Sequence, residues 1–432
     1  MEQEERKRII SLICREVVPA IGCTEPMAVS LCVARAAETL GVRPQKIEVL
    51  LSANILKNAM GVGIPGTGMI GLPISIALGA LIGKSAYQLE VLKECTPQAV
   101  EEGKQFIAEN RISIALKEGI TEKLYIEVCC RAGADEAVAV IAGGHTHFVK
   151  VVRNGEIVMQ EGCGGPCSEE SEPSLTLRKV YEFATQSPLD EISFILKTKD
   201  INEKAAQYAV SSGGSFGLDL GKTIRMPLEQ SVLGDSIYSR ILSQTACACD
   251  VRMGGAMVPV MSNSGSGNQG ICATMPVSVF AREHGNSEEE LVRALTLSHL
   301  TAIYIKQSLG KLSALCGCVV ASTGSSCGIT YLMGGNYNQI SYAVKNMIAN
   351  LTGMICDGAK PSCALKLASG VSTAILSAML AMQNKCVTSL EGIIDDDVDE
   401  SIRNLTVIGR DGMQETDKMV LGIMTHKKCN RQ

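Results

Sequence analysis

The sequence has 432 residues, of which 46% are hydrophobic and 20% are charged, so it can bury a large core in one or two domains. Aromatic residues make up only 3%, tryptophan is absent and glycine occurs 42 times, which favours a core of small aliphatic side chains and closely packed helices. The net charge of -5, without basic clusters, argues against a nucleic-acid-binding protein.

Two further features bear on location. Eighteen cysteines would suggest disulfides in a small secreted protein, but this chain is large, and its first residues carry charges throughout instead of an apolar signal core. We therefore expect a cytoplasmic protein with reduced cysteines. Residues 58–83 contain no charge, yet two prolines and seven glycines make the first half a loop, which a lipid environment does not tolerate. We expect no membrane partner.

The first 160 residues alternate between helical and strand patterns. Helical spacing predicts helices at 3–17, 27–40, 73–83 and 97–110, with the loop PAIGCTEP after the first. Period-two alternation predicts strands at 46–51, 112–116, 124–130, 137–142 and 148–152. An Asn154-Gly155 turn joins the last of these to a strand at 156–159. These patterns predict a mainly antiparallel sheet with helices packed against it.

Residues 160–174 are polar and rich in glycine and proline, which is typical of a linker. The chain after it is helical, with predicted helices at 176–185, 189–198 and 202–211 and long apolar helices beyond. Loops rich in glycine and serine are expected to interrupt them at 211–217, 262–270, 322–328 and 354–362. The expected fold class is α+β: an α/β part with a mainly antiparallel sheet over 1–165, and an all-α domain of buried helices over 166–432.

Three cysteines in the C-terminal half carry the most chemical information. Cys316, Cys356 and Cys363 lie among glycines and small apolar residues, with Gly358 and Pro361 in the loop between the last two. A cubane iron–sulfur cluster normally takes four thiolates, so three would leave one iron open as a Lewis acid. With 18 cysteines many such triples arise, and buried structural cysteines are the alternative on composition alone.

The motifs around these cysteines resemble a known family. ICDGAKPSCALK, the upstream CGC followed by TGSSCGITYLMGG, and the loop NSGSGNQG are similar to the catalytic α domain of the iron–sulfur L-serine dehydratases. PAIGCTEP and SANILKNAMGVGIPGTG are similar to the L-cysteine desulfidase branch, which is also called UPF0597. The resemblance covers essentially the whole chain.

The resemblance implies a [4Fe–4S] cluster held by Cys316, Cys356 and Cys363, with Cys318 as the alternative first ligand. It implies β-elimination of L-cysteine to pyruvate, ammonia and hydrogen sulfide, or the equivalent dehydration of L-serine. It also implies that Cys23 is the base. The residues support this independently, because Pro26 places Cys23 at a helix N-terminus, where the helix dipole favours a thiolate. Two other roles are open for Cys23: a structural cysteine buried at a turn, or a fourth ligand of the cluster.

The loop over 263–270 precedes a predicted helix. Free backbone N–H groups and the side chains of Ser264, Ser266 and Asn268 would suit a substrate α-carboxylate, and a flexible turn is the structural alternative. Lys57 and Asn58 could pair with the same carboxylate, although Lys57 could equally be a solvated helix end.

Other candidates remain open at this point. His145 and His147 share one face of a strand but lack an evident third metal ligand, and Cys429 near the C-terminus could be a mobile or simply an exposed thiol. A non-catalytic iron–sulfur or thiol sensor is the rival function from another class. A pyridoxal-phosphate lyase lacks a convincing lysine and phosphate loop. The expected partner is a small amino-acid substrate. The sequence is also compatible with a homodimer.

Overall fold

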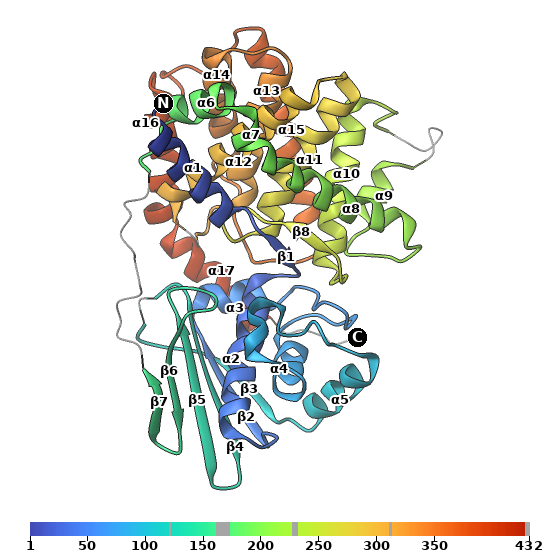
Figure 1. Ribbon diagram of the computed structural model, residues 1–432, viewed down its shortest axis with the longest axis vertical. Coiled ribbons are helices and arrows are strands. Elements are labelled where there is room, and N and C mark those ends of the chain that lie inside the picture. The colour runs from blue at the N-terminus through green and yellow to red at the C-terminus, as the bar shows by residue number, and fades with distance from the viewer. Residues whose placement is uncertain (121, 161–172, 227–231, 311–312, 428–432) are drawn as a thin grey trace.

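The computed structural model describes residues 1–432 except 121, 161–172, 227–231, 311–312 and 428–432. A part built on a twisted sheet lies against a larger helical part (Figure 1). The predicted α+β class is confirmed: the N-terminal sheet is mainly antiparallel, and the C-terminal region is helical. The expected boundary at 165/166 lies outside the described residues.

The sheet has six strands in the order β3-β2-β4-β5-β6-β7. Their bounds are β2 Lys46–Leu51, β3 Ile112–Leu116, β4 Tyr125–Ala132, β5 Asp135–Ala142, β6 Phe148–Arg153 and β7 Glu156–Gln160. Every neighbouring pair is antiparallel except β2 and β3. That parallel pair needs a crossover, which the three helices between the strands supply; these are α3 Ala53–Ala59, α4 Leu72–Leu81 and α5 Pro97–Ala108.

Helix α2 (Thr24–Leu40) covers one face of the sheet (Figure 1). Alternate residues of β4, namely Ile126, Val128 and Cys130, are fully buried in a core cluster shared with α2. The predicted hairpin is also confirmed, since Asn154 and Gly155 both have positive φ values, of 50° and 85°. Such a pair forms the tight turn that matches the twist of the flanking strands.

The helical part is built around α13 (Gly317–Leu332), which packs against four neighbours. These are α11 Gly267–His284, α12 Glu288–Leu309, α14 Tyr337–Leu351 and α15 Cys363–Met382. The helical part also contains α6 Leu177–Gln186, α7 Leu189–Ile192, α8 Leu196–Ser211 and α9 Leu220–Ile224. Helix α10 (Ile237–Met253) is largely buried and packs against α11 and α15.

Two sequence predictions in this part are wrong. Residues 322–328 form no loop but the middle of α13, because their small side chains allow close helix packing. A Cβ on Gly324 would lie 2.2 Å from the Ser298 carbonyl oxygen of α12. The predicted break between helices at 198 and 202 is also absent, since α8 runs through it.

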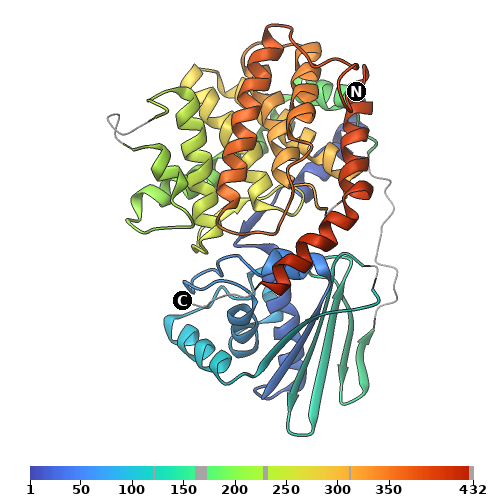
Figure 2. The same cartoon turned by 180° about the vertical axis from the view of Figure 1, so that it is seen from behind.

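Several segments connect the two parts. Helix α1 (Gln3–Glu16) packs against α12 in the helical part, and strand β1 (Pro19–Ile21) pairs with β8 (Pro259–Met261). Near the C-terminus, α16 (Val398–Val407) leads to α17 (Gln414–His426), which descends to contact α3 (Figure 2). The N-terminus therefore belongs spatially to the helical part, and the C-terminal helix reaches the sheet part.

Among the described residues, only α15 is long and apolar enough to cross a membrane by length and composition. Half of its most apolar window is buried inside the protein, and core helices often pass the same test. The uncharged stretch at 58–83 contains only the ten-residue helix α4. The apolar helices therefore give only weak evidence for a membrane span.

Candidate active site

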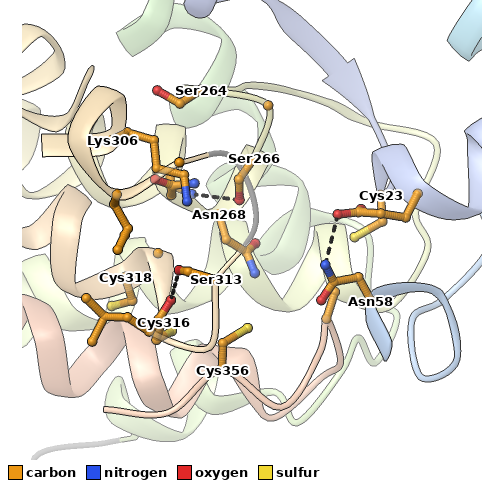
Figure 3. A pocket seen from close by; sticks show the side chains of 18 of the residues that line it. Cys23, Asn58, Ser264, Ser266, Asn268, Lys306, Ser313, Cys316, Cys318 and Cys356 are labelled. Atoms are coloured by element: carbon orange, nitrogen blue, oxygen red, sulfur yellow. Dashed lines mark hydrogen bonds between the residues drawn. The ribbon is translucent and has the colours of Figure 1, made fainter. Parts of the chain in front are cut away.

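A cavity of about 610 Å³ is lined by residues of both parts of the molecule (Figure 3). Cys23, Asn58 and His145 contribute from the sheet part. The helical part contributes the predicted loop and cysteine residues, which are Ser264, Ser266, Asn268, Cys316, Cys318, Cys356 and Cys363. Residues more than 300 positions apart in the sequence thus face one space, and all predicted site residues except Lys57 line it.

Cys23 is the N-cap residue of α2, as its position before Pro26 predicts, and it is 1% exposed. Burial raises the pKa of its thiol to about 12, while the charge of Arg252 and a hydrogen bond from it act in the opposite direction. The pairing of β1 with β8 holds Cys23 near the 264–266 loop. Thr24 Oγ1 also donates a hydrogen bond of 3.3 Å to the Gly265 carbonyl oxygen.

The predicted substrate loop precedes a helix, as expected, but α11 begins at Gly267, so residues 267–270 form the first turn of the helix instead of loop. Ser266 caps this helix, and its Oγ accepts a hydrogen bond from the Gln269 amide at 3.4 Å. Asn268 Oδ1 accepts a hydrogen bond from Arg252 at 2.9 Å. Ser264 has a positive φ of 48°, and its Oγ donates to Asn263 Oδ1 at 2.9 Å.

Backbone pairing brings two of the cysteine loops together. The Cys316 amide donates to the Met354 carbonyl oxygen at 2.9 Å, and the Cys356 amide donates to the Ala314 carbonyl oxygen at 2.6 Å. Cys363 begins α15, and its Sγ lies 3.7 Å from the Gly358 carbonyl oxygen.

The two candidates for the first cluster ligand differ in their surroundings. Cys316 is the N-cap residue of α13 and makes no side-chain capping bond. Cys318 lies inside that helix, and its Sγ donates to the Lys366 carbonyl oxygen at 3.0 Å. A Cβ on Gly370 would lie only 2.6 Å from this sulfur, so Cys318 is tightly packed. The geometry favours Cys316 over Cys318.

The donor set fits an iron–sulfur cluster better than a single metal ion. Within the described ranges, no group of three histidine, cysteine or acidic side chains could hold one ion. In a cubane cluster each thiolate binds a different iron, so its ligands stand further apart than around one ion. Three thiols on one cavity, with Lys306 and Lys366 also lining it, suit a cluster whose negative charge needs compensation.

Three charged residues that bear on the chemistry of the cavity were missed by the sequence reasoning: Glu25, Arg252 and Lys306. Arg252, near the end of α10, is 3% exposed, and Lys306 in α12 is 7% exposed. Burial lowers the pKa of Lys306 to about 8, although nearby Cys356 and Cys316 oppose this shift. Lys306 could have been identified from the sequence, because a charged residue within the apolar run HLTAIYIKQSL indicates a buried charge with a specific role. Arg252 gave no comparable signal.

Lys57 does not reach the cavity. It is 2% exposed and forms an ion pair with Asp417 of α17. The neighbouring Asn58 does line the cavity, where its Nδ2 donates to Glu25 Oε1 at 3.3 Å. The side chain of Lys57 therefore holds α17 against α3.

The two histidines are separated in the loop between β5 and β6. His145 lines the cavity, whereas the His147 ring forms a hydrogen bond of 2.9 Å with the Ala142 carbonyl oxygen. Cys429 lies outside the described residues.

The protein thus has a cavity that is rich in thiols and basic side chains and is large enough for a small polar molecule. Residues 86–422 match the family model described as "Serine dehydratase alpha chain". A "UPF0597 protein" of Bacteroides thetaiotaomicron is 69% identical over 99% of both chains. Another from Bacteroides fragilis is 68% identical over 99% of this chain and all of its own length, and one from Shewanella halifaxensis is 42% identical over similar coverage.

The chain belongs to the serine dehydratase alpha-chain family, within the group called UPF0597. The resemblance stated from the sequence motifs is thereby confirmed for both of these groups. The family is named for a dehydratase, which is a type of lyase.

Proposed function

We propose that this protein is a cytoplasmic, iron–sulfur-dependent lyase that converts L-cysteine to pyruvate, ammonia and hydrogen sulfide. The observation that carries the proposal is that Cys23, the 264–268 loop and the three cysteines Cys316, Cys356 and Cys363 all line one cavity. The family match supports lyase chemistry on a small amino acid. A [4Fe–4S] cluster bound at the three cysteines would supply an open iron that acts as a Lewis acid toward the substrate's leaving group.

The residues of the chain have separate tasks in this reaction. The first turn of α11, with Ser264, Ser266 and Asn268, binds the carboxylate, because amides at a helix N-terminus favour an anion. Cys23 removes the proton from the α-carbon in its thiolate form, which the charge of Arg252 and a hydrogen bond from it stabilise against the opposing effect of burial on the pKa. The electron pair of that C–H bond forms the Cα–Cβ double bond, and the sulfur leaves as hydrosulfide.

Aminoacrylate, the product of elimination, takes up a proton to form an imine. Water hydrolyses the imine to pyruvate and ammonia, so one water is consumed for each cysteine. A positioned base contributes about 10²–10⁴-fold to such a proton abstraction. Cys23 is 1% exposed, so bulk water has little access to the base itself, although the same burial raises the pKa of its thiol.

L-serine dehydration is the second candidate function, supported by the family name. The same residues would serve it, with hydroxide as the leaving group and the same two products. A non-catalytic sensor is the rival class, but a sensor has no need for a base and a carboxylate-binding loop on the same cavity as the three thiols.

The test is an anaerobic assay of the cluster-reconstituted protein with L-cysteine and, in parallel, with L-serine. We expect equimolar sulfide and pyruvate from cysteine, lost in Cys356→Ala. Cys386→Ala is the matched control, since this half-buried cysteine lies outside the cavity. Iron bound without turnover of either amino acid, and without a substrate-dependent change in its spectrum, would favour the sensor instead.

A further inference from the structure

The Arg252 guanidinium is a buried cation that has no carboxylate partner among the described residues. Its Nη1 donates to the neutral side chain of Asn268, and the guanidinium also forms a hydrogen bond with Cys23, whose raised pKa keeps it a neutral thiol. Its Nε has no hydrogen-bond partner among the described residues. Leaving a buried charge uncompensated is costly unless a ligand supplies the opposite charge. Because Arg252 lines the cavity, the missing anion would be a molecule bound in it.

The guanidinium lies directly against the first residue of α11. A Cβ on Gly267 would lie 2.2 Å from Arg252 Nε, so only glycine permits this approach. Ser266 Oγ accepts a hydrogen bond from the Gln269 amide, and the Ser266 carbonyl oxygen accepts one from the Gly270 amide. The amides of the helix's first two residues have no partner within the helix. An arginine charge and open helix amides together form a site for an anion.

Glu25 supplies the opposite charge in the same cavity. Its Oε1 accepts a hydrogen bond from Asn58, but within the described part of the chain no lysine or arginine forms an ion pair with it. Its position in the first turn of α2 also suits the helix dipole, which is its structural role. Both Glu25 and Arg252 act electrostatically on the thiol of Cys23, which therefore lies near both charges.

We propose that Arg252 and Glu25 form a clamp for the two charges of an α-amino acid. Arg252 and the first amides of α11 bind its carboxylate, and Glu25 binds its ammonium group. The α-carbon, to which both groups are attached, is thereby held next to Cys23. This inference rests on the proposed function and deepens it, because it assigns the two residues that select a substrate carrying both a carboxylate and an ammonium group.

The test uses two analogues that share the thiol of cysteine. Cysteamine lacks the carboxylate, and 3-mercaptopropionate lacks the ammonium group. Their affinities are measured by anaerobic titration calorimetry on the reconstituted full chain, which requires no turnover. We expect Arg252→Gln to weaken 3-mercaptopropionate about 10- to 100-fold and to leave cysteamine unchanged. Glu25→Gln should do the reverse.

Arg240→Gln is the control, since it makes the same change at the other end of α10, where Asp235 and Glu283 bind the guanidinium. Unchanged cysteamine binding in Arg252→Gln also reports that the variant is folded. If that variant does not fold, Arg252→Lys replaces it; we then expect a smaller loss confined to 3-mercaptopropionate, because lysine keeps the charge but not the planar fork.

The clamp is refuted if each variant weakens both analogues equally, if neither variant has an effect, or if neither analogue binds the wild-type protein. It is also refuted if Lys306→Met removes the preference for a carboxylate and Arg252→Gln does not. Failure of the proposed function is a separate result. If the variants show the expected affinities but the protein turns over neither cysteine nor serine, the clamp is supported and the proposed function fails. If the protein turns over cysteine but the variants leave both affinities unchanged, only the clamp is refuted.

Discussion

His299 should make the stability of the substrate loop sensitive to acid. Its side chain is fully buried beneath the loop, and burial lowers its pKa from 6.5 to about 3. The hydrogen bonds explain why the neutral ring is required. Asn263 Nδ2 donates to His299 Nδ1 at 3.1 Å, so Nδ1 carries no proton. Thr274 Oγ1 gives its proton to the Gly270 carbonyl oxygen and so accepts from Nε2 at 2.9 Å.

The direction of the pH effect follows from which state binds the proton. Below pH 6.5 the unfolded chain protonates His299 while the folded protein does not, so this part of the stability is present above pH 6.5. It is lost progressively as the pH falls from 6.5 toward 3. Between pH 8 and pH 5 the free energy of unfolding falls by about 2 kcal/mol because of this group. For a chain of this length that corresponds to about 2 °C in Tm.

The assay compares the Tm of wild type and His299→Gln at pH 8 and pH 5. The variant loses hydrogen bonds at both pH values, so the tested quantity is the change in Tm with pH. That change should be about 2 °C smaller in His299→Gln than in wild type. His284→Gln, at the exposed end of α11, is the matched control. Equal falls in Tm for wild type and His299→Gln would refute the assignment.

Three other predictions concern packing, an ion pair and the base. Gly324→Ala should lower the free energy of unfolding, measured by urea denaturation, by about 1–3 kcal/mol, because the added methyl group overpacks the helix contact. Gly422→Ala is the control and should have no such effect, because the space around Gly422 is open. Asp417→Asn should cost about 3 kcal/mol, because it leaves Lys57 buried without its partner, and should leave the KM for cysteine unchanged. Cys23→Ser should lose about 100-fold or more in turnover and keep its iron and acid-labile sulfide; loss of iron would make Cys23 a cluster ligand instead.

The sheet part could be predicted from sequence almost strand by strand. Its strands are half-buried, so period-two alternation and the Asn154-Gly155 turn carry the information locally. In the helical part the same glycine and serine signals were misleading, because inside α13 they serve close packing instead of a turn. A small residue between two helices and a small residue in a loop look alike until the neighbouring helix is known.

The candidate site divides in the same way. Residues with a local signature could be placed. Cys23, before Pro26, occupies the predicted helix N-terminus, and the loop that contains Ser266 precedes a helix, although that helix begins four residues earlier than predicted. Arg252 and Glu25 had no such signature, since their importance depends on missing counter-charges that only the three-dimensional neighbourhood reveals. The sequence therefore suggested Lys57 as the cation, whereas Asp417, 360 residues away, already binds it.

Four helix N-termini supply the chemically important residues of this cavity. Cys23, Ser266 and Cys316 are the N-cap residues of α2, α11 and α13, and Cys363 is the first residue of α15. Each helix N-terminus carries roughly half a positive charge. Their combined field favours a carboxylate and acts against the effect of burial, which raises the pKa of the Cys23, Cys316 and Cys363 thiols. The arrangement explains how glycine-rich loops can form an anion-binding site. In the proposed clamp, Glu25 then supplies the negative charge that the one positive group of an amino acid requires.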